Sequence, residues 1–480
     1  MVAGVVAKDN VLVVSSYSVW SAAAPGDPAS ISIRSRPGDV IPAGLLGLLV
    51  ATRVWSAQRV LWHVERLPVP ADRGDAFASL AAYLPDAYLG QALAIAVAIP
   101  EERPRAEALT ALAPHLTADL HAEAVATATA ITEPSARVEA LAGLVPYLPD
   151  EQQTTILRQA TATAAAVTDG YWRVRGLTSL ATHLPDHQRS TVLRPAVTAI
   201  GDASIGENLM YMFGELAPHL PVDLLTEATA TACTLTDVGR RAKALVALAP
   251  HLPTTALIIQ AWTAAEAIVH DDYRAKTMTA VAPHLPTERR PAALQQTLTA
   301  ASTLTNPYAR ATTLASLAAH LPDEQRAAAL EQALAAADTI TDHIYGAALQ
   351  VEALTSLIPH LPDSRCTAVI RRTLHAAATI RRESWRTIEL ARLTPHLPTH
   401  LRTETLTMIT KIRREQWRAM GLAAIAPQLS TGQLPQAVAV ADAIQDAYWQ
   451  AYAIAGLAWH LPSDERTRAV AALTIATPEP

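Results

Sequence analysis

A six-residue phrase, Leu-Ala-Pro-His-Leu-Pro with variants, recurs along the chain. Its second leucine, here called the anchor, occurs in twelve copies spaced 32 to 40 residues apart. The anchors are Leu84, Leu116, Leu148, Leu184, Leu220, Leu252, Leu285, Leu321, Leu361, Leu397, Leu429 and Leu461. Large apolar residues stand seven and four residues before each anchor, which is the period of one helix face. The pattern predicts a helix, helix A, before every anchor.

A second apolar stripe follows each anchor and predicts helix B; Leu294, Leu298, Ala301 and Leu304 are one example. Proline follows ten anchors and stands two residues before eight of them. Because proline cannot continue a helix but is tolerated in its first turn, these two columns should end helix A and begin helix B. Three and eight residues before the anchors most side chains are small, which should let neighbouring helices approach closely.

A pair of helices about 34 residues long cannot bury both of its apolar faces, so neighbouring pairs should stack into one continuous core. We therefore predict an all-α fold, a right-handed α-solenoid of about twelve two-helix repeats over residues 71–476. Residues 45–70 should form a capping helix and 477–480 a tail. Residues 1–44 differ, with short β-like runs at Val2–Ala7, Val11–Val14 and Ile31–Ser35, and we expect short strands or a loop there.

Composition narrows the function classes. The 480 residues are 50% hydrophobic, carry a net charge of −6 and include two cysteines, Cys233 and Cys366. These values exclude a disordered chain, a disulfide scaffold and a protein that is basic overall. No apolar run reaches the roughly 20 residues of a membrane span, and no signal peptide is evident. We expect a soluble cytoplasmic protein with buried, unreactive thiols.

Histidine directly precedes nine anchors: His115, His183, His219, His251, His284, His320, His360, His396 and His460. Zinc requires nitrogen ligands within about 2.1 Å, whereas equivalent positions in stacked helices lie about 8–10 Å apart. We therefore predict no metal site and expect these rings to bind the last carbonyls of helix A. Phosphate-loop, nucleophile-elbow, HExxH and CxxC motifs are absent from the sequence, which favours a protein without enzymatic activity or cofactor.

Arginine stands eleven residues before nine anchors: Arg73, Arg105, Arg137, Arg173, Arg241, Arg274, Arg310, Arg386 and Arg418. Arginine opposes the helix dipole at the start of helix A, so it needs a partner there. An acidic residue four positions earlier, as at Glu101 and Asp237, suits both a helix cap and an ion pair. We interpret the column as a structural ladder between repeats.

Two equivalent loops in consecutive repeats read Ile-Arg-Arg-Glu-Ser-Trp-Arg at 380–386 and Ile-Arg-Arg-Glu-Gln-Trp-Arg at 412–418. Residues 361–420 hold 12 Lys and Arg against 5 Asp and Glu. Doubled arginine beside tryptophan at a helix N-terminus can bind carboxylate or phosphate and stack on a flat group. The candidate partner-binding residues are Arg381, Arg382, Trp385, Arg413, Arg414 and Trp417. The alternative is a duplicated loop with a purely structural role.

The helix-pair layout is similar to tetratricopeptide and HEAT repeats, although the Trp-Leu-Gly-Tyr positions of the former are missing. The phrase at Leu245–Pro253 and Met278–Pro286 resembles the C-terminal sensor repeats of bacterial STAND-type (NLR-like) NTPases. That resemblance implies a sensor array that binds a partner, without the nucleotide-binding motifs of the NTPase module. Our leading hypothesis is a scaffold that binds a protein or peptide on its concave face. The alternative is nucleic-acid or nucleotide binding through residues 381–418.

Overall fold

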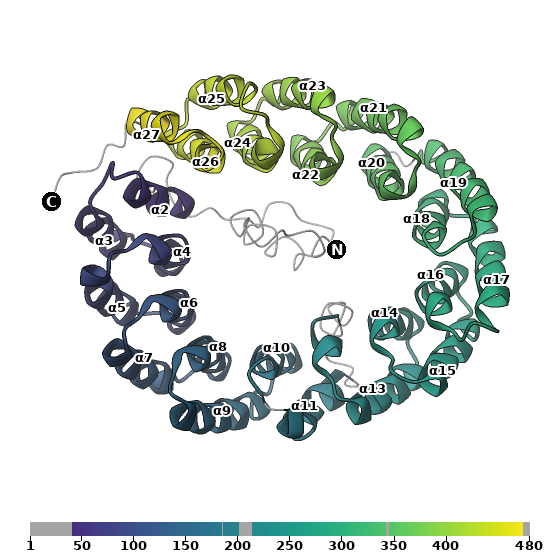
Figure 1. The fold of residues 1–480 in the computed structure, drawn as a ribbon, viewed down its shortest axis with the longest axis horizontal. Coiled ribbons are helices and arrows are strands. Elements are labelled where there is room, and N and C mark those ends of the chain that lie inside the picture. Colours follow the sequence, from purple (N-terminus) through teal and green to yellow (C-terminus); the bar gives the residue numbers. More distant parts are fainter. Residues whose placement is uncertain (1–40, 185, 201–213, 342–344, 474–480) are drawn as a thin grey trace. The chain divides into compact units, whose positions relative to one another are not determined.

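The computed structural model describes residues 41–184, 186–200, 214–341 and 345–473. Within these ranges every regular element is a helix, which confirms the predicted all-α solenoid class (Figure 1). The β-like runs predicted between Val2 and Ser35 lie outside the described residues. None of the helices in these ranges combines the length and apolar character needed to cross a bilayer.

A and B helices alternate in the described chain, except between α11 and α13, where residues 201–213 lie outside the described ranges. The A helices are α2 (Ala43–Ala51), α4 (Pro70–Leu80), α6 (Glu102–Leu112), α8 (Pro134–Leu144), α10 (Gly170–Ala181), α14 (Val238–Leu248), α16 (Asp271–Val281), α18 (Pro307–Ala318), α20 (Gly346–Leu357), α22 (Glu383–Leu393), α24 (Glu415–Ile425) and α26 (Ala447–Ala458). The B helices are α3 (Ala57–Arg66), α5 (Leu89–Val97), α7 (Ala118–Ala130), α9 (Asp150–Ala165), α11 (Asp186–Ile200), α13 (Val222–Thr234), α15 (Thr255–Glu266), α17 (Arg290–Ser302), α19 (Asp323–Asp338), α21 (Asp363–Thr379), α23 (Thr399–Thr410), α25 (Leu434–Asp442) and α27 (Ser463–Ala472).

The chain forms two compact units. Unit 1 comprises Met1–Ile156 and Arg382–Pro480, and unit 2 comprises Leu157–Arg381. In each unit the A helices form the concave layer and the B helices the convex layer (Figure 1). Unit 1 brings together helices from both ends of the chain, because α2 packs against α26. Beside this contact the rings of Tyr83 and Trp459 stack with centroids 5.2 Å apart.

The segment at residues 43–66 forms two helices, α2 and α3. Helix α2 packs on α4 as α4 packs on α6, and α3 contacts α5 as α5 contacts α7. Ser56 caps α3 by accepting a hydrogen bond from the backbone N–H of Arg59, at 3.2 Å. This pair therefore has the layout of a repeat although it lacks the anchor phrase.

Proline sets both boundaries of the turn between helices A and B. Helix α6 ends at Leu112, and Ala113–His115, with Pro114, continues as one turn of 3-10 helix. The anchor Leu116 then leaves the turn in an extended conformation. In five repeats the proline after the anchor stands at the N-cap of helix B and not within the first helical turn, as Pro362 does for α21. Its fixed φ suits the extended N-cap.

The predicted apolar face of helix A forms the core. Leu109, Leu112 and Leu245 are fully buried, and so is Phe77 at the equivalent position of α4. Burial of each such side chain contributes about 1.5–3 kcal/mol to folding. The other phenylalanine, Phe213, lies outside the described residues.

Small side chains hold neighbouring A helices close together. A Cβ atom at Gly456 in α26 would lie 2.6 Å from Cβ and 2.8 Å from Cα of Ala423 in α24. At Gly143 in α8 it would lie 2.6 Å from the Thr110 side chain of α6. These glycines leave no space for a side chain, so the approach of adjacent A helices depends on them.

We predict that Gly456→Ala destabilises the protein by about 1–3 kcal/mol, because the added methyl group overlaps α24. Alanine should otherwise stabilise a helix by about 1 kcal/mol relative to glycine. The control is Gly90→Ala in α5, where the new Cβ would meet only Leu120 Cδ2 at 4.0 Å. That variant should be as stable as the wild type or more so. Urea unfolding of both variants measures the difference, and equal gains would contradict close A-helix packing.

Candidate functional site

The arginine column binds the end of the preceding B helix. Arg105 Nε donates to the Ile99 carbonyl at 2.8 Å, and Arg137 Nε donates to the Ile131 carbonyl at 2.6 Å. The same contact recurs at Arg73, Arg274, Arg310 and Arg418. The column therefore joins successive repeats as predicted, but its common partner is a backbone carbonyl and not the acidic residue four positions earlier. Those carbonyls lack a partner within their own helix, and a guanidinium reaches them across the loop.

The carbonyl of the anchor leucine, in the turn after helix A, is bound by the side chain five residues after the anchor. Arg290 Nε donates to the Leu285 carbonyl at 3.0 Å, and Arg402 Nε to the Leu397 carbonyl at 3.1 Å. Gln153, Arg189, Arg326, Cys366 and Arg466 make equivalent contacts. His121 Nε2 instead lies 3.0 Å from the Ala113 carbonyl. At the end of helix A itself, Arg326 Nε donates to the Ala318 carbonyl at 3.1 Å and Arg466 Nε to the Ala458 carbonyl at 3.0 Å. In these two repeats the structure contradicts the role predicted for the histidine before the anchor. The first turn of helix B lies over the end of helix A, so its side chains reach those carbonyls.

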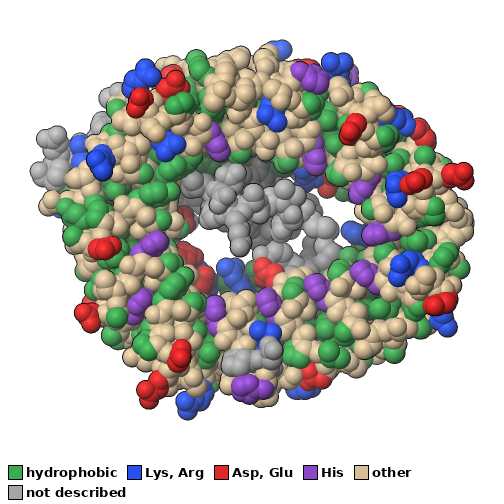
Figure 2. Space-filling view, viewed as in Figure 1, with side chains coloured by type: hydrophobic (Ala, Val, Ile, Leu, Met, Phe, Trp, Pro, Cys, Tyr) green, Lys and Arg blue, Asp and Glu red, His purple; other side chains and the backbone are tan. Residues whose placement is uncertain are grey.

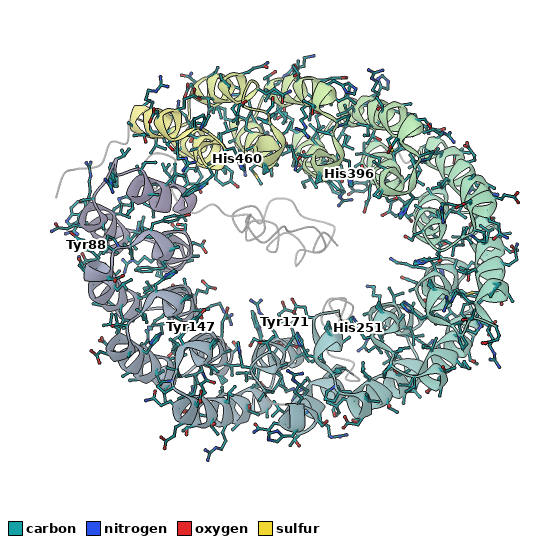
Figure 3. The ribbon with its side chains drawn as sticks, in the orientation of Figure 1. Tyr88, Tyr147, Tyr171, His251, His396 and His460 are labelled. Atoms are coloured by element: carbon teal, nitrogen blue, oxygen red, sulfur yellow. The ribbon has the colours of Figure 1, made fainter. Side chains whose placement is uncertain are left out.

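The histidine column lies along the concave edge of each unit. Histidines recur along this edge in Figure 2, and Figure 3 labels His251, His396 and His460 there. Desolvation lowers the pKa of His183, His219, His284, His320, His360, His396 and His460. In unit 2 the charges of neighbouring histidines add to this effect, as His251 and His320 do at His284. The described residues contain no group of three His, Cys, Asp or Glu side chains arranged to hold a metal ion.

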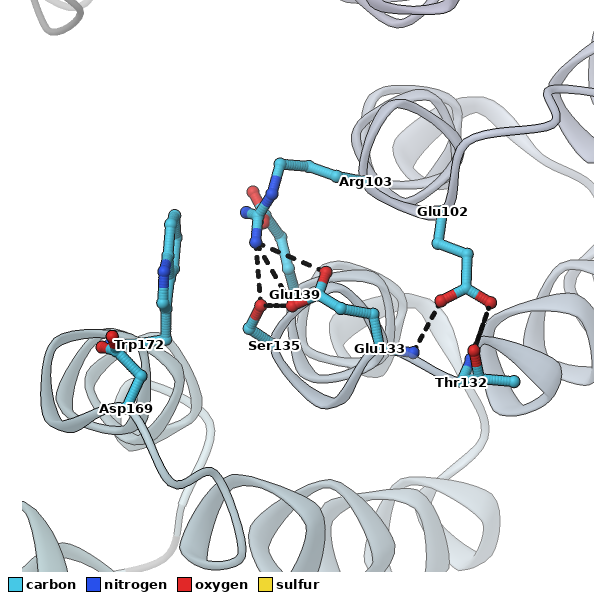
Figure 4. Close-up of polar contacts among 8 residues, drawn as sticks. All are labelled: Glu102, Arg103, Thr132, Glu133, Ser135, Glu139, Asp169 and Trp172. Carbon is cyan, nitrogen blue, oxygen red and sulfur yellow. Dashed lines mark hydrogen bonds and ion pairs between the residues drawn. The ribbon is translucent and has the colours of Figure 1, made fainter.

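A carboxylate at the start of helix A binds the backbone of the next repeat. Glu383 accepts hydrogen bonds from the backbone N–H groups of Arg413 at 2.8 Å and Arg414 at 3.0 Å. The same arrangement joins Glu102 to Thr132 and Glu133, shown in Figure 4, and Glu415 to Gln445 and Asp446. We call Glu102, Glu383 and Glu415 the carboxylate clamps. The repeat pattern did not predict these contacts, although the repeated Arg-Arg-Glu at Glu383 and Glu415 was a signal for two of the clamps.

The clamps are ionised more readily than a free glutamate. Backbone N–H groups of Thr132 and Glu133 lower the pKa of Glu102. Desolvation raises the pKa of Glu383, but the N–H groups of Arg413 and Arg414 and the charges of Arg386 and Arg414 outweigh it, so the pKa is lowered. A carboxylate that accepts two N–H groups is stabilised in its charged form.

Next to the Glu102 clamp, Arg103 links α6 to α8. Its guanidinium donates to Ser135 Oγ at 2.8 Å and pairs with Glu133 at 3.4 Å and Glu139 at 3.5 Å (Figure 4). In unit 2, Asp169 caps α10 by accepting the backbone N–H of Trp172 at 3.1 Å. The polar groups at the starts of these A helices are thus used for contacts within the fold.

The six candidate residues separate into different environments. Arg382, Arg413 and Arg414 are exposed at the starts of α22 and α24, which pack together in unit 1, and Trp385 is half-buried. Trp417 is only 8% exposed, and its carbonyl accepts a hydrogen bond from Thr387 Oγ1 at 3.2 Å. Arg381 is exposed and is the last residue of unit 2. Trp417 is therefore a core residue, since it packs between repeats.

The clamp changes what the doubled arginines can bind. The backbone N–H groups of Arg413 and Arg414, which an anion would use, already bind Glu383. In the part of the chain that the structure describes, the guanidinium groups of Arg382, Arg413 and Arg414 form no ion pair within 4.0 Å. The available chemistry is therefore three exposed guanidinium groups beside one half-buried indole.

Both cysteines are free and half-buried. Desolvation raises the pKa of Cys233, although Arg241 opposes it. Desolvation and Asp363 also raise the pKa of Cys366, whose Sγ lies 3.5 Å from the Leu361 carbonyl. A raised pKa leaves the thiol protonated and weakly nucleophilic at neutral pH.

No protein-family model and no curated protein matches this sequence. Among solved structures, Kap121p is similar over 88% of this chain and 50% of its own, with 13% identity and a TM-score of 0.37. The structure of the karyopherin Kap121p bound to the SUMO protease Ulp1p is 14% identical with a TM-score of 0.36, and the match covers 90% of this chain and 50% of that chain. Ton1535 from Thermococcus onnurineus NA1 is 12% identical with a TM-score of 0.26, and the match covers 79% of this chain and 98% of Ton1535. This chain spans about half the length of Kap121p, and these low values carry no inference about function.

We predict that Glu383→Ala destabilises the protein by about 1 kcal/mol, because two backbone N–H groups lose a charged acceptor that is partly screened by solvent. Glu383→Gln should destabilise the protein less than Glu383→Ala, because the amide oxygen can still accept a hydrogen bond. Because the folded pKa is lowered, the contribution is present above about pH 4.3 and is lost as the pH falls through the folded value. Urea unfolding at pH 7 and pH 4 tests this. Glu404→Ala, which removes an exposed carboxylate of α23, is the control and should be neutral.

The histidine column should make the protein less stable in mild acid. Its folded pKa values are lowered, so between those values and about 6.5 the unfolded chain binds more protons. The free energy of unfolding should therefore fall as the pH drops from 7.5 to 5.5. The triple variant His284→Gln, His320→Gln and His360→Gln should show a smaller fall, whereas His400→Gln should match the wild type. An unchanged pH dependence in the triple variant would show that other groups are responsible.

Proposed function

We propose that this chain is a non-catalytic repeat scaffold that binds a protein or peptide segment on its concave side. The observation that carries the proposal is the pair of neighbouring A-helix starts in unit 1. Arg382, Arg413 and Arg414 are exposed there, and the side chain of Trp385, in the first turn of α22, is half-buried. Guanidinium groups form paired hydrogen bonds with carboxylates, and an indole offers a flat apolar surface to a side chain. We call these four residues the arginine patch.

Several features favour a peptide over nucleic acid at the arginine patch. Glu383 and Glu415 place carboxylates between the arginines, and these would repel a phosphate backbone. Trp417 is buried, so only one of the two indoles is open to stacking. The net charge of −6 also opposes the approach of a long polyanion. A short peptide with a few acidic groups carries less negative charge than a nucleic acid and is therefore repelled less. It also does not need two exposed indoles for stacking.

A narrower part of the proposal concerns the biological setting. The repeat phrase resembles the sensor repeats of STAND-type NTPases, which supports a sensor array acting in the cytoplasm. The absence of enzyme motifs from the sequence supports a binding function over a catalytic one.

Selection from a displayed peptide library with the purified full chain would test the proposal. Selected peptides should bind the triple variant Arg382→Ala, Arg413→Ala and Arg414→Ala at least tenfold more weakly than the wild type. The control is Arg158→Ala, Arg289→Ala and Arg371→Ala, which removes three exposed arginines from helix B or its N-cap and should change affinity less than twofold. Circular dichroism confirms the fold of both.

Two results would contradict the proposal. Failure to select any peptide would remove the binding function, and equal affinity of the two triple variants would remove the arginine patch. Oligonucleotide binding that weakens steeply with salt would instead support the nucleic-acid alternative.

A further inference from the structure

A second surface stands out in unit 2, at the position nine residues before the anchor. Two residues along a helix correspond to a rotation of 200°, so this position points away from the buried one seven residues before the anchor. In unit 2 it holds Arg175 on α10, Lys243 on α14 and Lys276 on α16. The A helices form the concave layer, so these cations project from the concave side.

Lys243 and Lys276 are neighbours on helices that pack together. Desolvation lowers the pKa of Lys276, the charge of Lys243 lowers it further, and only Glu352 raises it. Neither lysine forms an ion pair within 4.0 Å in the part of the chain that the structure describes. At Lys276 only Glu352 offsets the two positive charges, so a further anionic group between the two lysines would stabilise both in their charged form. We call them the lysine pair.

The surroundings of the lysine pair are also basic. Helix α14 carries Arg240, Arg241 and Lys243 and contains no acidic residue. Asp237, at its N-cap, is occupied in accepting the Arg240 backbone N–H at 2.7 Å. On α16, Asp271 pairs with Arg274. Among the described A helices of unit 2, the cations at this position are confined to α10, α14 and α16, because α18 holds Thr312 and α20 holds Glu352 there. The equivalent position in unit 1 is acidic at Asp75, Glu107 and Glu139.

We propose that the lysine pair binds an extended acidic segment of a partner protein. Adjacent A helices lie about 8–10 Å apart. In polyproline II conformation three residues advance the chain by about 9.3 Å and return to the same face. An extended segment with acidic residues at i and i+3 would thus place one carboxylate at each lysine. This inference rests on the proposed peptide-binding function but concerns a surface distinct from the arginine patch.

Other occupants fit the lysine pair less well. Residues 1–40 carry three cations, Lys8, Arg34 and Arg36, and three anions, Asp9, Asp27 and Asp39, so this segment offers no net negative charge. A long nucleic acid would meet the net charge of −6 of the whole chain. A short acidic peptide brings enough charge for two lysines and little more.

Fluorescence anisotropy with the full chain would measure the interaction. The probe is a labelled twelve-residue peptide with glutamate at every third position and proline and serine between. Lys243→Glu with Lys276→Glu should weaken binding at least tenfold. Lys411→Glu with Arg468→Glu makes the same change in net charge at exposed sites in unit 1 and should weaken it less than threefold. A peptide of equal composition with its glutamates in one block should bind several-fold more weakly.

Carbodiimide crosslinking provides an independent readout that requires no variant. The chain has only four lysines, Lys8, Lys243, Lys276 and Lys411. The spaced peptide should crosslink to Lys243 and Lys276, with Lys411 as the exposed internal control. Crosslinks spread evenly over the four lysines, or equal weakening by the two charge-reversed variants, would overturn the inference.

The remaining outcomes separate this inference from the proposed function. If the acidic peptide does not bind but library-selected peptides still require the arginine patch, the lysine pair fails and the scaffold function stands. If the acidic peptide binds through the lysine pair while the arginine-patch variants bind the library-selected peptides as the wild type does, the lysine pair stands and the arginine patch fails. A single-stranded oligonucleotide that displaces the peptide at lower concentration would overturn the partner class.

Discussion

The close contact between neighbouring A helices is the constraint on which the architecture depends. One repeat has too little core to fold alone, so each pair of helices is stable only against its neighbours. Glycine and alanine at the contact, as at Gly456 and Ala423, allow adjacent backbones to approach without a side chain between them.

Polar side chains complete the connections that apolar packing leaves open. Loops between helices expose carbonyl and N–H groups that have no partner in the helix. Six arginines of the column bind a carbonyl at the end of a B helix, as Arg105 does. The carboxylate clamps bind N–H groups in the next loop, as Glu383 does. These contacts run from repeat to repeat, so they set the angle between repeats as well as satisfying the backbone. Much of the charge in the sequence is therefore structural.

The cations that these contacts do not use are the ones available for binding. The arginine patch belongs to unit 1 and the lysine pair to unit 2, and each is formed by two neighbouring A helices. An array of this kind can bind a long partner through several weak contacts, whose combined affinity depends on their spacing. Repeated helices present equivalent positions at regular intervals, so under the two proposals the sign of the charge at one position would decide which segment of a partner each unit can accept.

The sequence by itself determined the helices, their pairing and the stacked all-α class, because apolar period, proline positions and anchor spacing are local properties. Two loop sequences as similar as those around Trp385 and Trp417 could not show which indole is buried. Only the tertiary structure decided that, together with the carbonyl partners of the arginines and the contact of α2 with α26. These outcomes depend on which backbone and side-chain groups of another repeat lie next to a residue. The periodicity within one repeat does not encode those contacts between repeats.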